Sequence, residues 1–329
     1  SLRACADSLH RAAGDLLWAD GCHRLLLRAG QSLEAAGLAG PAAAYWRELI
    51  AVSDRVLGRE HPDTLAIGEM LARACLVAGR PAEAIPWFRW LLTSRISALG
   101  PDHAAAIDVR LSLGRALMIA GQSDEAITML DGAVRDYDRV RGSDHLDTLR
   151  ARDELARAYV TAGQIGPALQ LRQLTLKQLE IRQGARHPDT IAHRQVLADA
   201  YLADGRFKDA IAQYKRTLAD RERALGTDHL DTIGTQVRLG SAYQLSGKIS
   251  STMQLYEQAR AGYERVLGAD HRDTLTHRAS LARIYTTAGR MADAATLLRD
   301  TVTRCERILP AGDPLTESVR ASLADMMGG

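Results

Sequence analysis

The sequence predicts an all-α fold in which a helical hairpin recurs every 42 residues. Three sets of residues keep this interval along the 329-residue chain. They are a histidine (His61, His103, His145, His187, His229 and His271), a turn glycine (Gly37, Gly79, Gly121, Gly163, Gly205, Gly247 and Gly289) and a small residue (Gly30, Ala72, Gly114, Ala156, Ala198, Gly240, Ala282 and Ala324). A period between about 20 and 50 residues is typical of stacked supersecondary units, so the repeat itself predicts the architecture.

The first helix of each hairpin contains the small residue. In the second repeat Leu71 precedes Ala72, and Cys75 follows three residues later, which is the spacing of one apolar helix face. A small side chain lets two helices approach closely, while the leucine fills the space beside it. Gly79 then supplies the left-handed cap that ends the helix. The second helix follows, with alanine and an aromatic residue or leucine four positions apart in most repeats.

Each histidine is followed by the residues that we expect to start the first helix. An Asp-Thr pair such as Asp63-Thr64 offers a side-chain acceptor to the first unpaired amides. We expect the histidine itself to be wedged at the joint between one repeat and the next. Two departures predict weaker joints: residues 104–106 are alanines where the third repeat should have its cap, and Arg172 occupies the aromatic position of the fourth repeat.

These signals divide the chain into seven repeats between two flanking helices. The repeats are residues 19–60, 61–102, 103–144, 145–186, 187–228, 229–270 and 271–312. We expect an N-terminal flanking helix over residues 1–18 and a C-terminal capping helix over residues 313–329.

The pattern L-[AG]-x-x-[YLC], glycine turn, alanine and aromatic residue resembles the tetratricopeptide repeat (TPR) family. The 42-residue unit and the linker Leu57 to Leu65, L-G-x-[DE]-H-x-D-T-L, are most similar to kinesin-light-chain-type repeats. This resemblance implies an α-α superhelix, a TPR solenoid, whose first helices line a concave groove.

Composition excludes several classes of protein. No run of about 18 apolar residues occurs, which argues against a membrane-spanning protein. The net charge of +2 provides no global field for nucleic acid, so a nucleic-acid partner is disfavoured. Four cysteines without C-x-x-C spacing suggest reduced thiols and a cytoplasmic location. Because the chain begins at Ser1, we expect it to come from a longer protein.

No enzyme is predicted, and no cofactor or metal. The histidines of successive repeats should lie on the order of 10 Å apart, whereas zinc holds nitrogen ligands at about 2.0–2.1 Å. Ser246-Gly247-Lys248 looks like part of a phosphate loop, but Ala242 and Ile249 replace residues that the motif requires. We expect no catalytic residues.

Resemblance to the family implies that the position after the small residue faces the groove. Residues at or beside that position are candidates for binding a partner: Arg73, Arg115, Arg157, Asp199, Arg283, Glu69 and Asp153. Arg110, Arg152 and Arg194 form a second row that we expect to flank them. Two interpretations stay open, a basic stripe that binds a ligand and a face whose charges neutralise one another.

Two further observations bear on binding. The chain has no asparagine, whereas peptide-binding repeats of this type usually use asparagines to hold a peptide backbone, so sequence-tolerant peptide binding is disfavoured. Trp87 and Trp90 flank the packing residue Phe88 and form a possible second patch. Tryptophans of this kind are either interface hot spots or packing residues of the longer helix.

We therefore expect a non-catalytic scaffold that binds a protein or peptide partner, or another domain of its parent chain. Kinesin-light-chain-type repeats in arginine-rich bacterial proteins often follow an NTPase module of the STAND/NB-ARC type, so the resemblance suggests the sensing C-terminal region of a bacterial signalling regulator. A stand-alone adaptor is the alternative. A groove for an anionic ligand, such as RNA or an acidic peptide, is a third hypothesis. The sequence does not predict the oligomeric state.

Overall fold

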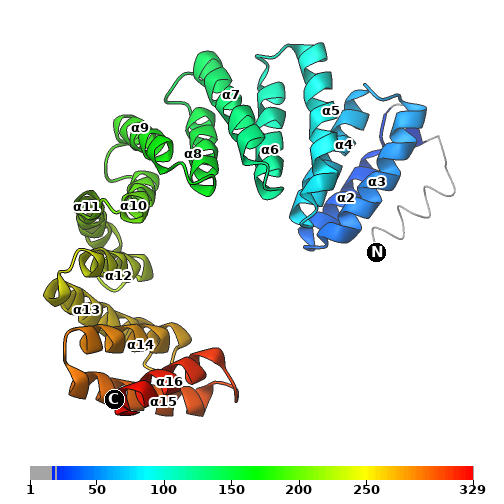
Figure 1. Ribbon diagram of the computed structural model, residues 1–329. Coiled ribbons are helices and arrows are strands. Elements are labelled where there is room, and N and C mark those ends of the chain that lie inside the picture. The colour runs from blue at the N-terminus through cyan, green and yellow to red at the C-terminus, as the bar shows by residue number, and fades with distance from the viewer. Residues whose placement is uncertain (1–16, 19–20, 329) are drawn as a thin grey trace. The chain divides into compact units, whose positions relative to one another are not determined.

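The structure is a computed structural model that describes residues 17–18 and 21–328. These residues form fifteen α-helices and no strand, which confirms the predicted all-α repeat fold (Figure 1). The predicted helix over residues 1–18 lies almost wholly outside the described residues. The helices are α2 Arg24–Ala35, α3 Ala39–Val56, α4 Pro62–Val77, α5 Pro81–Leu99, α6 Ala104–Ile119, α7 Ser123–Arg141, α8 Leu146–Thr161, α9 Ile165–Gln183, α10 Pro188–Ala203, α11 Phe207–Leu225, α12 Leu230–Leu245, α13 Ile249–Leu267, α14 Arg272–Thr287, α15 Met291–Ile308 and α16 Pro314–Gly328.

The chain divides into two compact units, Ser1–Leu171 and Arg172–Gly329, called unit 1 and unit 2 below. Within each unit a helix packs mainly on its neighbours in sequence, as α4 on α5 and α6 on α7 in unit 1, or α12 on α13 in unit 2. Two helices lie within each of the residue ranges that we expect to be repeats. We therefore propose these seven ranges as the repeating units.

The turn inside each hairpin follows from the repeated glycine. In the second repeat the Gly79 amide donates to the Leu76 carbonyl at 3.0 Å, and the Arg80 amide donates to the Cys75 carbonyl at 2.8 Å. Gly79 has a φ of 72°, which a residue without Cβ adopts readily. This pair of hydrogen bonds is the Schellman motif, and it turns the chain from α4 into α5.

Close approach of the two helices requires the small residue. At Gly114 on α6, an added Cβ would lie 2.6 Å from Cγ of Leu130 on α7, well inside van der Waals contact. Ala72, Ala156, Ala198 and Ala282 hold the same position and are at most 1 % exposed. The buried leucines beside them, including Leu71, Leu113 and Leu155, complete the core between the helices.

The expectation about the helix start is wrong in one respect, because the histidine is the N-cap residue. The backbone of His145 is extended (φ −68°, ψ 142°), so its Nδ1 can accept from the Asp147 amide at 3.2 Å. Thr148 instead turns inward and donates to the Gly142 carbonyl at 2.8 Å. His145 is not wedged into the joint, since 38 % of its side chain is exposed. Asp147 lies in the first turn, where the helix dipole favours a negative charge.

The two joints that were expected to be weaker are both bonded in the structure. His103 accepts from the Ala105 amide at 3.2 Å, so the third repeat is capped without an Asp-Thr pair. Arg172 donates from Nη1 to the Val196 carbonyl at 2.9 Å. The sequence-based expectation failed at His103 because the histidine itself caps the helix, whereas the sequence departs from the repeat only after it, at residues 104–106.

Candidate partner-binding faces

Three arginines project from equivalent positions on consecutive first helices of unit 1. Arg73 on α4, Arg115 on α6 and Arg157 on α8 are all exposed, and we call them the arginine stripe. Each follows the buried small residue of its helix, so its side chain lies outside the core. Among the residues that the structure describes, none forms an ion pair with Arg73.

Two members of the stripe share one carboxylate. Arg115 lies 2.9 Å from Glu154 Oε1, and Arg157 pairs with the same oxygen. The Glu154 side chain is 16 % exposed, whereas those of Arg115 and Arg157 are 46 % and 64 % exposed. The positive charge of the arginine stripe is therefore only partly neutralised. Two of its three guanidinium groups share a single carboxylate, and the third, that of Arg73, pairs with none among the described residues.

A recess of about 570 Å³ lies beside this charge cluster, between α6 and α8. Leu130 and Met118 line it together with both arginines. Ile119, at the end of α6, also borders the recess and is 60 % exposed. The recess thus combines apolar walls with an excess of positive charge.

The acidic candidates of unit 1 lie elsewhere on their helices. Glu69 faces the second helix of its hairpin, where its carboxylate lies 3.7 Å from Arg95. Asp153 is partly buried on α8. Neither residue joins Arg115 and Arg157 around Glu154.

In unit 2 the equivalent positions have different chemistry. Asp199 accepts hydrogen bonds from the Tyr214 hydroxyl and from Arg238, the latter at 2.9 Å. Burial, with the bonded carboxylate of Asp199 as a further cause, raises the pKa of Tyr214. Arg283 is exposed and borders a recess of about 430 Å³ that Asp325 also lines. The arginine stripe therefore belongs to unit 1.

The expectation that Arg110, Arg152 and Arg194 flank the groove is wrong. Arg152 is 3 % exposed and donates to the Ser143 carbonyl and to Asp138, at 2.8 and 3.0 Å. Arg110, Arg194 and Arg278 are bonded to carboxylates of neighbouring second helices in the same way, and we call all four the clamp arginines. The reason is helix geometry: a residue three before the buried leucine lies on the leucine's face, toward the second helices.

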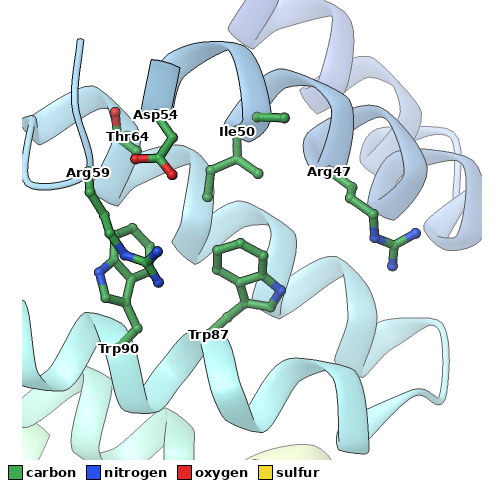
Figure 2. A pocket seen from close by; sticks show the side chains of 8 residues that line it. Arg47, Ile50, Asp54, Arg59, Thr64, Trp87 and Trp90 are labelled. Atoms are coloured by element: carbon green, nitrogen blue, oxygen red, sulfur yellow. The ribbon is translucent and has the colours of Figure 1, made fainter. Parts of the chain in front are cut away.

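The tryptophan pair lies on the other side of unit 1, between the second helices α3 and α5. Trp87 and Trp90 form an edge-to-face pair with ring centroids 5.7 Å apart. They line a pocket of about 280 Å³, here called the tryptophan pocket (Figure 2). Ile50 and Asp54 project from α3 toward the indoles, and the Arg59 guanidinium lies 5.2 Å from the Trp90 ring centroid. Both tryptophans are partly exposed, so packing does not use them fully.

Sequence reasoning missed several residues of these two sites. The apolar rim of Met118 and Ile119 was not recognised, although both follow Arg115 at helical spacing. Asp54 was not recognised either. Its signal is Gly68, which stands where the third, fourth, fifth and seventh repeats carry a clamp arginine.

Within the described residues, no group of three or more His, Cys, Asp or Glu could hold a metal ion. In that same part of the chain, no helix combines the length and apolarity needed to span a bilayer.

Models of known protein families match the repeats of this chain. Models described as tetratricopeptide repeat match residues 24–104, 103–180, 190–264 and 231–307, which is most of the chain. None of the curated protein sequences searched matches this chain.

Solved structures with the same fold agree with the predicted subfamily. The nearly identical TPR-like repeats of a kinesin light chain from Podosopora anserina share 28 % identity and a TM-score of 0.58, covering 63 % of this chain and 98 % of that chain. BtubC (BKLC) from P. vanneervenii shares 17 % identity and a TM-score of 0.54, covering 74 % and 92 % of the two chains. The C-terminal part of a TPR repeat-containing protein from Cytophaga hutchinsonii shares 15 % identity and a TM-score of 0.58, covering 88 % and 98 %.

Proposed function

Because the chain belongs to the tetratricopeptide repeat family, we propose that it is a non-catalytic interaction module whose arginine stripe binds an acidic segment of a partner protein. Proteins of this family bind protein or peptide partners. The partner's chemistry is inferred from the face on which the stripe lies.

The main support for an acidic partner is the carboxylate that two arginines of the stripe share. Glu154 pairs with both Arg115 and Arg157, and within the described part of the chain neither arginine has a carboxylate of its own. Partly exposed ion pairs contribute about 0–1 kcal/mol each, so an incoming carboxylate can replace Glu154 at one guanidinium at small cost. Arginine favours such a partner because its planar group binds a carboxylate through two parallel hydrogen bonds.

The recess beside the stripe suggests that the acidic segment of the partner also contains an apolar residue, which would bind there. Leu130 and Met118 line it, and exposed Ile119 continues the apolar surface. Burying apolar area contributes about 25 cal/mol per Å², which adds affinity to the charge contacts. RNA is less well supported, because no aromatic side chain lines the recess for base stacking.

The direct test is a selection of random peptides displayed on phage against the folded chain. We expect the selected peptides to combine acidic residues with at least one apolar residue. The triple variant Arg73→Glu, Arg115→Glu and Arg157→Glu should then lose at least about tenfold in affinity, measured by fluorescence anisotropy, because charge complementarity becomes repulsion. Helicity and the melting temperature should be nearly unchanged.

A matched triple variant controls for net charge. Arg89, Arg135 and Arg299 are exposed residues of second helices, and their change to glutamate alters the net charge equally. We expect this variant to keep its affinity. Equal loss in both triples, or unaltered binding by the stripe variant, would refute the proposed role of the stripe.

We further propose that the module is the sensing region of a larger bacterial signalling regulator, with a stand-alone adaptor as the second candidate. The resemblance to kinesin-light-chain-type repeats supports this setting. The encoded sequence upstream of Ser1 separates the two candidates. A G-x-x-x-x-G-K-[ST] loop there would support the regulator, and a start codon directly before Ser1 would exclude it.

A further inference from the structure

The tryptophan pocket lies at the second repeat, which lacks an ion pair that recurs elsewhere in the chain. In the fourth, fifth and seventh repeats, and at the C-terminal helix α16, an arginine donates to a carboxylate fourteen residues earlier, on the preceding second helix. The pairs are Arg152 with Asp138, Arg194 with Glu180, Arg278 with Glu264 and Arg320 with Glu306. The distances from nitrogen to oxygen lie between 2.7 and 3.1 Å.

The second repeat keeps the acid and lacks the arginine. Asp54 on α3 holds the acidic position, but the residue fourteen positions later is Gly68. The Trp90 ring occupies the space of the missing side chain, since a Cβ on Gly68 would lie 2.5 Å from Trp90 Cζ3. The reverse arrangement is found in the third repeat, where Arg110 packs on Gly132 with Cδ 3.4 Å from the position of an added Cβ.

Asp54 is consequently left without a cation. Its side chain is exposed, and among the described residues none forms an ion pair or hydrogen bond with it. Figure 2 shows its carboxylate directed toward the tryptophan pocket, with Trp90 below it.

Two residues that line the pocket hold repeat positions equivalent to those that bond a clamp guanidinium. In the fourth and fifth repeats the clamp arginine also donates to a loop carbonyl, that of Ser143 or Ala185. The equivalent loop residue of the second repeat is Arg59, and it lines the pocket together with Asp54. The acidic acceptor of a clamp guanidinium is therefore present at the pocket, while the arginine itself is missing from this repeat.

Two arginines of the chain border the pocket without filling this role. Arg47 pairs with Glu83. Arg59 lies over the Trp90 ring and forms no ion pair with a described residue. Arg59 is thus a local competitor for the indole face, whereas the Asp54 carboxylate stays unpaired.

We propose that the tryptophan pocket binds the guanidinium group of an arginine side chain from a partner protein. Asp54 accepts its N–H groups, and the indoles of Trp87 and Trp90 contact its planar face through cation–π attraction, for which tryptophan is the best ring. The proposal goes beyond the acidic segment assigned to the arginine stripe, because this pocket lies between second helices and selects the opposite charge.

The probe is Nα-acetyl-arginine methylamide, with the citrulline analogue as a neutral molecule of the same shape. The full chain is labelled with 5-fluorotryptophan, and its four tryptophans are assigned by single Trp→Phe changes. In fluorine NMR titrations we expect the arginine probe to shift the Trp87 and Trp90 signals saturably in the millimolar range. The citrulline probe should leave both signals in place.

Variants of the pocket make the test specific. Asp54→Asn should weaken binding about tenfold or more, since it removes the charged acceptor. Arg59→Gln should strengthen binding, because the competitor is gone. The double variant Gly68→Arg with Trp90→Gly copies the arrangement of the third repeat, so its own arginine should occupy the site and abolish binding at Trp87.

Asp124→Asn, an exposed acid on α7, serves as the matched control and should bind like the parent chain. Circular dichroism checks that each variant is folded. If the double variant does not fold, the single variants Asp54→Asn and Arg59→Gln decide the outcome. Equal binding of the citrulline probe, or unchanged affinity in Asp54→Asn, would overturn the proposal.

Discussion

Removing the buried guanidinium of Arg194 should be among the most damaging single changes in unit 2. Its side chain is fully buried, and it donates to Asp220 at 2.6 Å, to the Ala185 carbonyl at 2.8 Å and to Glu180 at 3.1 Å. In Arg194→Met the aliphatic volume is kept, while all three acceptors lose the hydrogen bond from Arg194. The variant therefore isolates the polar contacts.

The expected loss follows from these contacts. The bond to Asp220 matters most, because that carboxylate is 14 % exposed and its other cations are more distant, Arg186 at 3.9 Å and Arg223 at 4.0 Å. A hydrogen bond to a charged group contributes about 1.5–3 kcal/mol, and the carbonyl bond adds about 1 kcal/mol. Glu180 is 31 % exposed and also pairs with Arg216, so we assign it little. The total of about 2.5–4 kcal/mol overlaps the cost of about 3–5 kcal/mol for breaking one side of a buried ion pair.

The assay is urea unfolding followed by circular dichroism, with hydrogen exchange of α10 and α11 amides as a second measurement. The exchange data are needed because repeat arrays can unfold in parts, and a single midpoint then misrepresents the local loss. Arg299→Met, an exposed change on α15, should alter the free energy of unfolding by less than about 0.5 kcal/mol. If Arg194→Met cost no more than this control, the interpretation of the clamp arginines as structural would be refuted.

Three further predictions concern caps, packing and pH. His187→Ala should destabilise the chain by about 1 kcal/mol in urea unfolding, because Nδ1 no longer accepts from the amide two residues on. Gly114→Ala should cost about 1–3 kcal/mol by the same measurement, since the new methyl group meets Leu130. His277 is buried with Nε2 donating to the Tyr256 carbonyl at 2.8 Å, and burial lowers its pKa. The unfolded chain therefore takes up the proton first, and stability should fall as pH drops below about 6.5, by at most about 1.4 kcal/mol per pH unit from this residue.

Each of these predictions has a matched control. His187→Asn keeps a side-chain acceptor at the cap and should lose less stability than the alanine variant. Gly234→Ala meets no atom within 4 Å, so it should stabilise α12 by up to about 1 kcal/mol through helix propensity. His277→Gln should flatten the stability profile between pH 6.5 and 5 relative to the parent chain, and an unchanged slope would rule out His277 as its source.

The helices, turns and hairpin pairing were predictable because their signals are local and periodic. Gly79 ends a helix through contacts within six residues, and Leu71 beside Ala72 defines the face that must be buried. The position of the helix cap could be predicted from the sequence, but not which residue provides it. Asp and His can both supply the acceptor, and only the extended backbone of His145 decides that its Nδ1 reaches the amide.

The candidate sites were less predictable because they depend on partners from other repeats. The sequence alone determined the repeat, the family resemblance and the exposed position of Arg115 and Arg157 on first helices. Only the tertiary structure decided that Arg152 lies in the core, that Glu154 is shared by two arginines, and that Asp54 pairs with no arginine among the residues described. The physical reason is that the role of a charged side chain depends on which charged groups the neighbouring helices place within bonding distance of it. The sequence of a single repeat does not contain those distances, because they are set by how the repeats pack on one another.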